Sequence, residues 1–410
     1  MVLPGGLLVL LTWAATVSLV VLLGLPFTMM SRGVVTLRHL AAAGWWGVLV
    51  TAVLGTVLAF FVPLSSLGTR ITVLVAGLFA VGISAIRWNG RRLCRVRMTV
   101  PTWLWITGAA LAMGYLAIAT LGPVTHYDAG LYQWAAGRYA AEYPVVPGLA
   151  NLYAPLGYGS IQPVFEGLMA SSPWRVNGLR LVNGAFLALL VLETLSRLAT
   201  KPRAAGTAVA LVGSTITFVP MLWMADFWVA SPTPDVPVLV LGITGAAYWT
   251  DFVLGQPTSK QKSLDPLPVL IVLGGLLVAL RPTMAPLVVF LGAATLALLV
   301  TKRRTTTPIP VLVALALVAL QGILLAARDR MLSGWLQFPL SIYSFDVPWR
   351  ASDPTGLRRA TLGYARDPDN WQEAVSGWSW LGPWISRLPN LWDPWLFLVT
   401  VIAGTALLIF

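Results

Sequence analysis

The feature that most constrains this 410-residue chain is a series of apolar runs, most of them close to the length of a membrane-spanning helix and almost free of charge. A bilayer core of ~30 Å needs about 20 apolar residues per helix. A soluble domain carries about 25% charged residues, whereas this chain has 10% charged and 57% apolar residues, which excludes a cytosolic enzyme and a disordered chain. The sequence predicts an all-α polytopic transmembrane helical bundle of eleven spans, near residues 4–25, 41–62, 71–87, 102–121, 179–198, 205–224, 234–254, 267–280, 283–301, 308–327 and 392–410.

Lysine and arginine predict the orientation of these spans, because cytoplasmic loops carry the excess of positive charge. The predicted cytoplasmic side carries 15 Lys/Arg against three acids, and the predicted outer side carries 12 Arg against 12 acids. The net charge of +12 is therefore an orientation signal, and no excess remains for nucleic acid. We expect the amino terminus outside and these residues in cytoplasmic loops or at adjoining span ends: Arg32, Arg38, Arg87, Arg91, Arg92, Arg95, Arg97, Arg197, Lys201, Arg203, Lys260, Lys262, Lys302, Arg303 and Arg304.

The chain is predicted to be one membrane domain, 1–410, in which two long outer loops fold over the spans. Its parts are a four-span region 1–121, a first outer loop 122–178, central spans 179–327, a second outer loop 328–391 and a last span 392–410. Both outer loops are expected to contain interfacial helices, because tryptophan and tyrosine gather at the membrane–water interface. Phe410 closes an apolar run without a polar tail, so we expect a truncated product.

The first outer loop contains the segment with the densest polar and aromatic content, from Thr125 to Ser160. Residues 128–142 can form an interfacial helix with Asp128 at its start and Glu142 at its end. Asp128 has two interpretations. It can cap the helix, since Asp is a favoured N-cap residue, or it can be a functional carboxylate beside His126 and Tyr132.

The stretch HYDAGLYQ…EYPVVPGLANL in this loop resembles one shared by uncharacterised bacterial multi-pass membrane proteins. These in turn resemble the GT-C superfamily of glycosyltransferases, which use polyprenyl-phosphate-linked sugars. The resemblance implies a GT-C-like fold, a plasma (inner) membrane location and an extracytoplasmic active site. It also implies that Asp128 is the catalytic base or a metal ligand. The chain departs from the family pattern at Gln133, Tyr153, Pro155 and Gly159.

Two later segments add polar groups at the predicted outer ends of spans. Thr233, Pro234 and Asp235 form a helix-start signal, and Asp226 lies close enough in the sequence to be a cation ligand. The run before Arg281 rises only ~21 Å, short of the bilayer core. Arg281 is therefore expected below the outer surface or at the break of a helix, where it can hold a phosphate. Alternatively, it snorkels to the interface from a short hairpin.

The second outer loop is predicted either to be an amphipathic interfacial loop or to complete the site. In the second case its arginines bind a phosphate, and its aromatic and acidic residues line a sugar site. The candidates are Arg328, Arg330 and Arg350 for phosphate, and Tyr343, Asp346, Trp349 and Asp353 for sugar.

The function expected from these observations is an inverting membrane glycosyltransferase with Asp128 as the base. Its partners would be a polyprenyl-phosphate sugar donor, a glycan or lipid-linked acceptor and membrane lipids. A divalent cation (Mg, Mn or Ca) is a possible cofactor, with Asp128 and Asp226 as its ligands. Donor phosphate is assigned to Arg281, Arg350 and Arg328, and substrate to His126, Tyr132, Arg138, Glu142, Asn151, Asp235, Tyr343 and Trp349. The alternatives are a lipid or polysaccharide transporter or flippase, and a non-catalytic partner subunit with the same fold.

Overall fold

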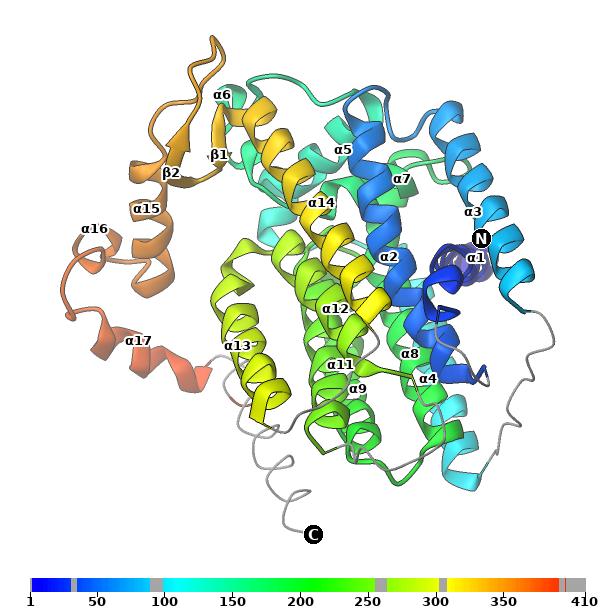
Figure 1. The fold of residues 1–410 in the computed structure, drawn as a ribbon. Helices are drawn as coiled ribbons and strands as arrows, with labels where there is room; N and C mark the ends of the chain where they lie inside the picture. Colours follow the sequence, from blue (N-terminus) through cyan, green and yellow to red (C-terminus); the bar gives the residue numbers. More distant parts are fainter. Residues whose placement is uncertain are drawn as a thin grey trace. The chain divides into compact units, whose positions relative to one another are not determined.

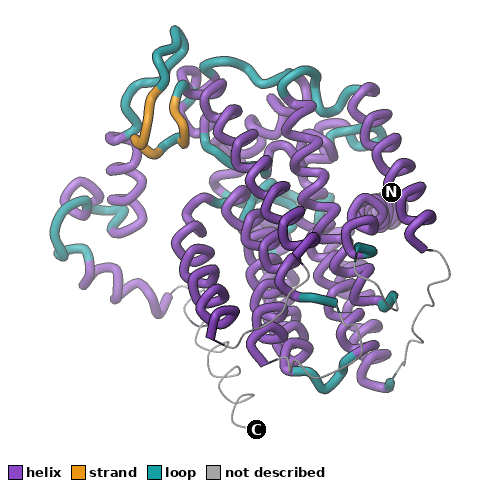
Figure 2. The backbone as a smooth tube through the Cα atoms, viewed as in Figure 1, coloured by secondary structure: helices purple, strands orange, loops and turns teal. Residues whose placement is uncertain are grey.

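The computed structural model describes residues 2–30, 35–88, 99–254, 264–301, 308–390 and 395, and these are mostly helical (Figures 1 and 2). The chain divides into two compact units. The first unit is built from residues 1–145 and 160–325, and the second from residues 146–159 and 326–410. The helix α14 (Pro308–Ser333) runs from the first unit into the second.

The first unit is a bundle of long helices. Within the described residues it contains α1 (Val2–Thr28), α2 (Leu37–Ala59), α3 (Leu67–Trp88), α4 (Val100–Ala119), η1 (Ala129–Gln133), α5 (Trp134–Glu142), α7 (Gln162–Met169), η3 (Arg175–Leu181), α8 (Val182–Thr200), α9 (Ala205–Trp223), α10 (Ala225–Trp228), α11 (Asp235–Leu254), α12 (Pro266–Leu280), η4 (Pro282–Met284), α13 (Ala285–Thr301) and most of α14.

In the described part of the chain, nine helices are long and apolar enough to cross a membrane. They match nine of the predicted spans, and the eighth prediction matches the shorter helix α12. An all-α polytopic fold is therefore confirmed. The eleventh predicted span, 392–410, lies outside the described residues except for Trp395, as do most of the predicted cytoplasmic arginine and lysine loops.

One predicted boundary is wrong. The span predicted to end at residue 327 continues as α14 to Ser333, so Arg328 lies in the last turns of a helix and not in a loop. The apolar pattern stops at Arg328, but the backbone continues as helix because the next residues pack inside the second unit. Leu332 and Ser333 are buried there.

The second unit contains α6 (Leu149–Leu152), η2 (Ala154–Gly157), β1 (Trp335–Gln337), β2 (Leu340–Ser344), α15 (Thr355–Arg366), α16 (Trp371–Ala374), α17 (Leu381–Arg387) and η5 (Leu388–Asn390). The strands pair antiparallel as a hairpin, where the sequence predicted interfacial helices only. The run from Trp335 to Ser344 is rich in aromatic and β-branched residues, which favour strands. Phe338 anchors the hairpin by packing against Ala150 and Ala351.

The helices α1 and α2 approach each other at glycines. A β-carbon on Gly24 would overlap the carbonyl of Ala43, and one on Gly47 would overlap the carbonyl of Val20. Small residues at such crossings allow close backbone packing inside a membrane. The helix α8 packs on this pair at Trp13 of α1. Trp13 lies against Gly184 and donates from Nε1 to the carbonyl oxygen of Leu181 at 2.9 Å.

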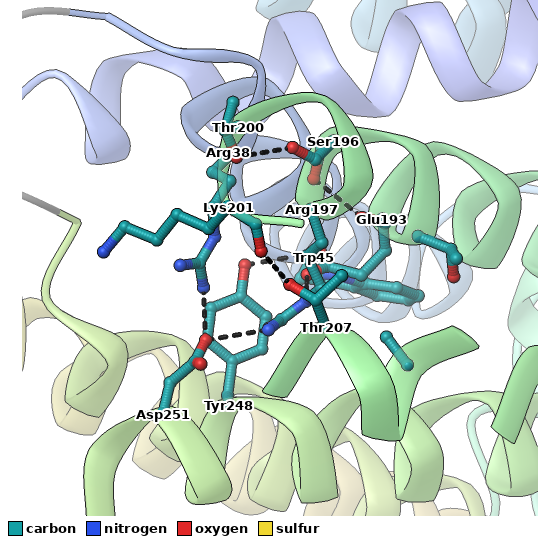
Figure 3. Close-up of polar contacts among 12 residues, drawn as sticks. Arg38, Trp45, Glu193, Ser196, Arg197, Thr200, Lys201, Thr207, Tyr248 and Asp251 are labelled. Carbon is teal, nitrogen blue, oxygen red and sulfur yellow. Dashed lines mark hydrogen bonds and ion pairs between the residues drawn. The ribbon is translucent and has the colours of Figure 1, made fainter. Parts of the chain in front are cut away.

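A buried ion-pair network links α2, α8 and α11 (Figure 3). Arg197 donates to Glu193 at 2.6 Å and to Asp251 at 2.7 Å, and Arg38 donates to the same oxygen of Asp251 at 2.6 Å. The side chains of Arg197 and Glu193 are 1% and 0% exposed. Two carboxylates and two guanidinium groups thus neutralise each other inside the bundle.

Two aromatic residues complete this network. Trp45 donates from Nε1 to Glu193 at 3.1 Å, and the hydroxyl of Tyr248 donates to Glu193 at 3.3 Å. The guanidinium of Arg197 lies 4.5 Å from the centre of the Tyr248 ring. Arg38 and Arg197, which the sequence assigned to cytoplasmic loops or span ends, therefore lie on helices and hold three of them together.

We predict that Arg197→Leu lowers the free energy of unfolding by about 3–5 kcal/mol, because it leaves the buried carboxylate of Glu193 without its cation and removes one of the two arginines that pair with Asp251. The matched control is Arg203→Leu, since Arg203 is exposed; its effect should stay within about 0.5 kcal/mol. Thermal unfolding in detergent, followed by tryptophan fluorescence, measures both. A loss below about 1 kcal/mol for Arg197→Leu, as for an exposed ion pair, would contradict the role of the network.

Candidate functional site

Asp128 lies in the first helical turn after α4, immediately before η1, and its side chain is half-buried. The carboxylate does not cap the helix, because no backbone N–H donates to it. Within the part of the chain that the structure describes, it makes no hydrogen bond and no ion pair. The interpretation of Asp128 as a helix cap is therefore wrong, and its carboxylate is available for other chemistry.

The helix that follows Asp128 is not uniform. Residues 129–133 form the π-helical segment η1, which contains Tyr132 and continues directly as α5 to Glu142. A helix over 128–142 is confirmed, with this local widening as an unexpected feature, and its position at a membrane interface stays a prediction. Single π-turns inside helices are frequent at functional sites, and this one begins at the residue after Asp128.

His126 lies on an aromatic surface formed by the segment between α9 and α11. Its ring is centred 4.4 Å from the ring of Phe227 and 6.2 Å from that of Trp228. Beside it, Thr125 donates to a carboxylate oxygen of Asp226 at 3.0 Å. These contacts bring the chain that leads to Asp128 against the end of α9.

The charges around His126 show which groups meet at this end of the bundle. Burial lowers the pKa of His126, the negative charges of Asp128 and Asp235 raise it, and the positive charge of Arg281 lowers it. The net effect is a lowered pKa, so the imidazole is neutral near pH 7. Its buried Nδ1 has no hydrogen-bond partner among the described residues.

Arg281 lies at the turn of a hairpin formed by α12 and α13. The helix α12 ends at Leu280 because a residue before proline is disfavoured in helical conformation, and Arg281 is extended. Gly274 packs against Val288, so the two helices run side by side (Figure 1). The structure therefore has a hairpin here, and the depth of Arg281 in a membrane stays a prediction.

The guanidinium of Arg281 forms a salt bridge with Asp235 at the start of α11, and its side chain stays 44% exposed. Thr233 fixes this carboxylate by donating to it at 2.7 Å and accepts from the backbone N–H of Asp235 at 3.3 Å, so the predicted helix start is confirmed. Ser160 donates to the carbonyl oxygen of Leu280 at 2.8 Å and closes the end of α12. Arg281 is thus held at a fixed position.

The structure brings together five of the predicted site residues: His126, Asp128, Asp226, Asp235 and Arg281. We call them the Asp128 cluster. Arg138 and Glu142 are not part of it. They pair with each other at 3.2 Å on the exposed face of α5, toward its far end. Tyr132 lies in η1 of the first unit. The remaining predicted residues belong to the second unit: Asn151, Arg328, Arg330, Tyr343, Asp346, Trp349, Arg350 and Asp353.

Asp128 and Asp226, the predicted cation ligands, are not joined by a third ligand among the described residues. Among the described residues, no group of three His, Cys, Asp or Glu side chains is placed to hold a metal ion. One carboxylate oxygen of Asp226 accepts from Thr125. Asp128 and Asp226 alone are a poor fit to a divalent cation, and we derive no step through one.

Asn183 was not among the predicted site residues, although it holds the segment that packs against the His126 ring. Asn183, in the first turn of α8, donates through Nδ2 to the carbonyl oxygens of Trp228 at 2.9 Å and Ser231 at 2.8 Å. An asparagine near the start of the predicted span 179–198 was the available signal. Its partners lie 45 and 48 residues away in the sequence, which no local pattern indicates.

The chain belongs to a family described as a domain of unknown function (DUF8201), which matches residues 7–410. Neither the curated proteins nor the solved structures contain a significant match.

We predict that Asp128→Ala changes the free energy of unfolding by less than about 0.5 kcal/mol, since its carboxylate supports no backbone group. Asp265→Ala is the matched comparison. Asp265 caps α12 by accepting from the N–H of Leu267 at 3.1 Å, and its loss should cost about 0.5–2 kcal/mol. Thermal unfolding in detergent compares the two variants. A cost for Asp128→Ala equal to that of Asp265→Ala would restore the capping role.

Proposed function

We propose that this protein transfers a sugar from a polyprenyl-phosphate donor to a hydroxyl group of a glycan or lipid-linked acceptor, on the outer face of a bacterial plasma membrane. The observation that supports the proposal most is the unengaged, half-buried carboxylate of Asp128, at the same end of the bundle as Arg281. An acid and a cation placed in this way suit a reaction that removes a proton at one atom and releases an anion at another.

Asp128 is the proposed general base. A base must be within hydrogen-bond reach of the proton it removes, and a carboxylate without partners among the described residues can accept the hydroxyl of an acceptor. The hydroxyl oxygen attacks the anomeric carbon as the bond from that carbon to the phosphate oxygen breaks. The proton passes to Asp128, and the lipid phosphate leaves with the electron pair. One displacement inverts the anomeric centre.

Arg281 is the proposed partner of the leaving phosphate. A guanidinium group has five N–H donors in a fixed fork, and the described contacts use one of its nitrogens for Asp235. That salt bridge orients the group, and the remaining donors can pair with phosphate oxygens as negative charge develops on them. His126, neutral and packed on Phe227, adds no opposing charge.

The residues of the second unit remain predictions from the sequence. Arg350 and Arg328 are proposed to assist at the donor phosphate, and Tyr343 and Trp349 to contact the sugar. Tyr343 is exposed and in edge contact with Phe345, which leaves ring surface available. Trp349 is fixed by Nε1, which donates to the carbonyl oxygen of Arg330 at 3.1 Å.

The test uses purified protein in liposomes, with a panel of polyprenyl-phosphate sugars labelled in the sugar. We predict that Asp128→Asn slows transfer by about 10²–10⁴-fold, the usual contribution of a general base, while donor binding is kept. Arg281→Lys should weaken transfer as well, since an ammonium group cannot form the bidentate contact. The control is Glu373→Gln, an exposed acid of α16. Transfer by Asp128→Asn at the normal rate would reject the proposal.

A transporter or flippase is the second candidate, and one observation favours it. Ionisable residues within membrane helices often mark transport pathways, and Arg38, Glu193, Arg197 and Asp251 lie on such helices. The same liposomes distinguish the two functions. Movement of the labelled lipid between leaflets, without sugar transfer and with Asp128→Asn fully active, would favour transport.

A further inference from the structure

Glu166 is a carboxylate that neither the Asp128 cluster nor the ion-pair network uses. It lies in the middle of α7, in the segment between two candidate spans, and is 1% exposed. Neither of its oxygens has a hydrogen-bond partner among the described residues. An ionised carboxylate in such a place is expensive, because burial removes its water and nothing replaces it.

The side-chain amide of Gln162 also lacks hydrogen-bond partners among the described residues. Gln162 lies one turn earlier on α7 and is 3% exposed, and within the described residues both its Oε1 and its Nε2 lack partners. Residues four apart on a helix face each other, so the two side chains are within reach. The amide of Gln162 also lowers the pKa of Glu166, so the two groups are near each other although no hydrogen bond joins them.

The helix α5 closes this site from the other side. A β-carbon on Gly137 would lie 2.5 Å from Oε2 of Glu166, so the carboxyl group points at the backbone of α5. Gln133, one turn before Gly137, is also buried, with its Oε1 unpartnered among the described residues. The polar atoms without partners thus gather where α5 and α7 pack against each other.

One proton satisfies four of these atoms. A protonated Glu166 donates its O–H to Oε1 of Gln162, and Nε2 of Gln162 donates to the other carboxyl oxygen. The result is a neutral, cyclic pair of hydrogen bonds in which no charge is buried. Buried polar groups in native proteins are nearly always hydrogen-bonded, and no other donor among the described residues reaches these oxygens.

We propose that Glu166 is a proton-binding site, whose carboxyl group is protonated at neutral pH and closes a neutral acid–amide pair with Gln162 that holds α7 against α5. The site goes beyond the proposed transfer reaction and does not depend on it. The helix α5 continues directly from η1, so this site and Asp128 lie on the same stretch of helix.

The elements packed on α7 bring no charge to oppose this state. Burial raises the pKa of Glu166 well above its ordinary value of 4.5, and only the nearby amide of Gln162 acts against it. None of the titratable or charged residues on those elements shifts the pKa of Glu166, because each is exposed, paired with another group or at the far end of its helix. These residues are Arg138, Tyr139 and Glu142 on α5, Arg175 and Arg180 on η3, Arg38 and His39 on α2, and Glu193 and Arg197 on α8.

The first experiment follows stability against pH. A raised pKa means that the folded protein binds the proton more tightly than the unfolded chain. Its stabilisation is therefore complete below pH 4.5 and is lost as the pH rises through the folded pKa. As the pH rises above 4.5, we expect the thermal midpoint of the wild-type protein to fall more steeply than that of Glu166→Gln, which keeps the shape and the neutral charge. The control Glu142→Gln removes an exposed carboxylate at the end of α5 and should follow the wild type. Parallel curves for wild type and Glu166→Gln would overturn the proposal.

The second experiment observes the proton directly. At neutral pH, the infrared difference spectrum between wild type and Glu166→Gln should contain the C=O stretch of a protonated carboxyl group. The band should disappear at high pH, and Gln162→Leu should shift it to higher frequency because the acid loses its acceptor. A difference spectrum that shows only carboxylate bands at neutral pH would overturn the assignment, whatever the outcome of the transfer assays.

Discussion

A membrane interior offers no water to a polar group, so each such group must find its partner within the protein or remain unsatisfied at high cost. This constraint explains many polar contacts in the first unit. Thr56, on α2, donates back to the carbonyl oxygen of Ala52 at 2.7 Å. The end of α12 is closed by Ser160, and the carboxylates of Glu193 and Asp251 are held by Arg197. In these examples a helix ends, or packs on a neighbour, at a place where a polar group has a hydrogen-bond or ion-pair partner within the protein.

Asp128 and Glu166 are the two carboxylates on which our proposals rest, and their surroundings give them opposite roles. Asp128 is half-buried, and its proposed role is to accept the proton of an acceptor hydroxyl group. Glu166 is closed in between α5 and α7 and can reach a low-cost state only by keeping a proton. Pairs of acids whose environments differ in this way are a common basis for dividing chemical and structural work. The same stretch of helix, η1 and α5, connects them.

The sequence predicted those parts of the fold that depend on local pattern. Apolar runs predicted the spans, and Pro282 and Pro234 placed the hairpin turn and the start of α11. It could not show that Arg197 pairs with Asp251, 54 residues later, because a basic residue at the end of a span also matches an orientation signal. The sequence singled out Asp128 as a candidate but left a helix cap open, and the backbone geometry was needed to exclude the cap. Glu166 resembled an ordinary loop acid until its burial was known.

The two ends of the first unit differ in how their charges are used. One end contains Arg197, and there the carboxylates of Glu193 and Asp251 are both paired with guanidinium groups that hold the helices together. At the end that contains Asp128, one salt bridge fixes Arg281 and still leaves its side chain 44% exposed, while Asp128 has no partner among the described residues. Unpaired charge lowers stability without benefit to folding, so it persists where function requires it. On this physical ground we assign the proposed chemistry to the Asp128 end of the first unit.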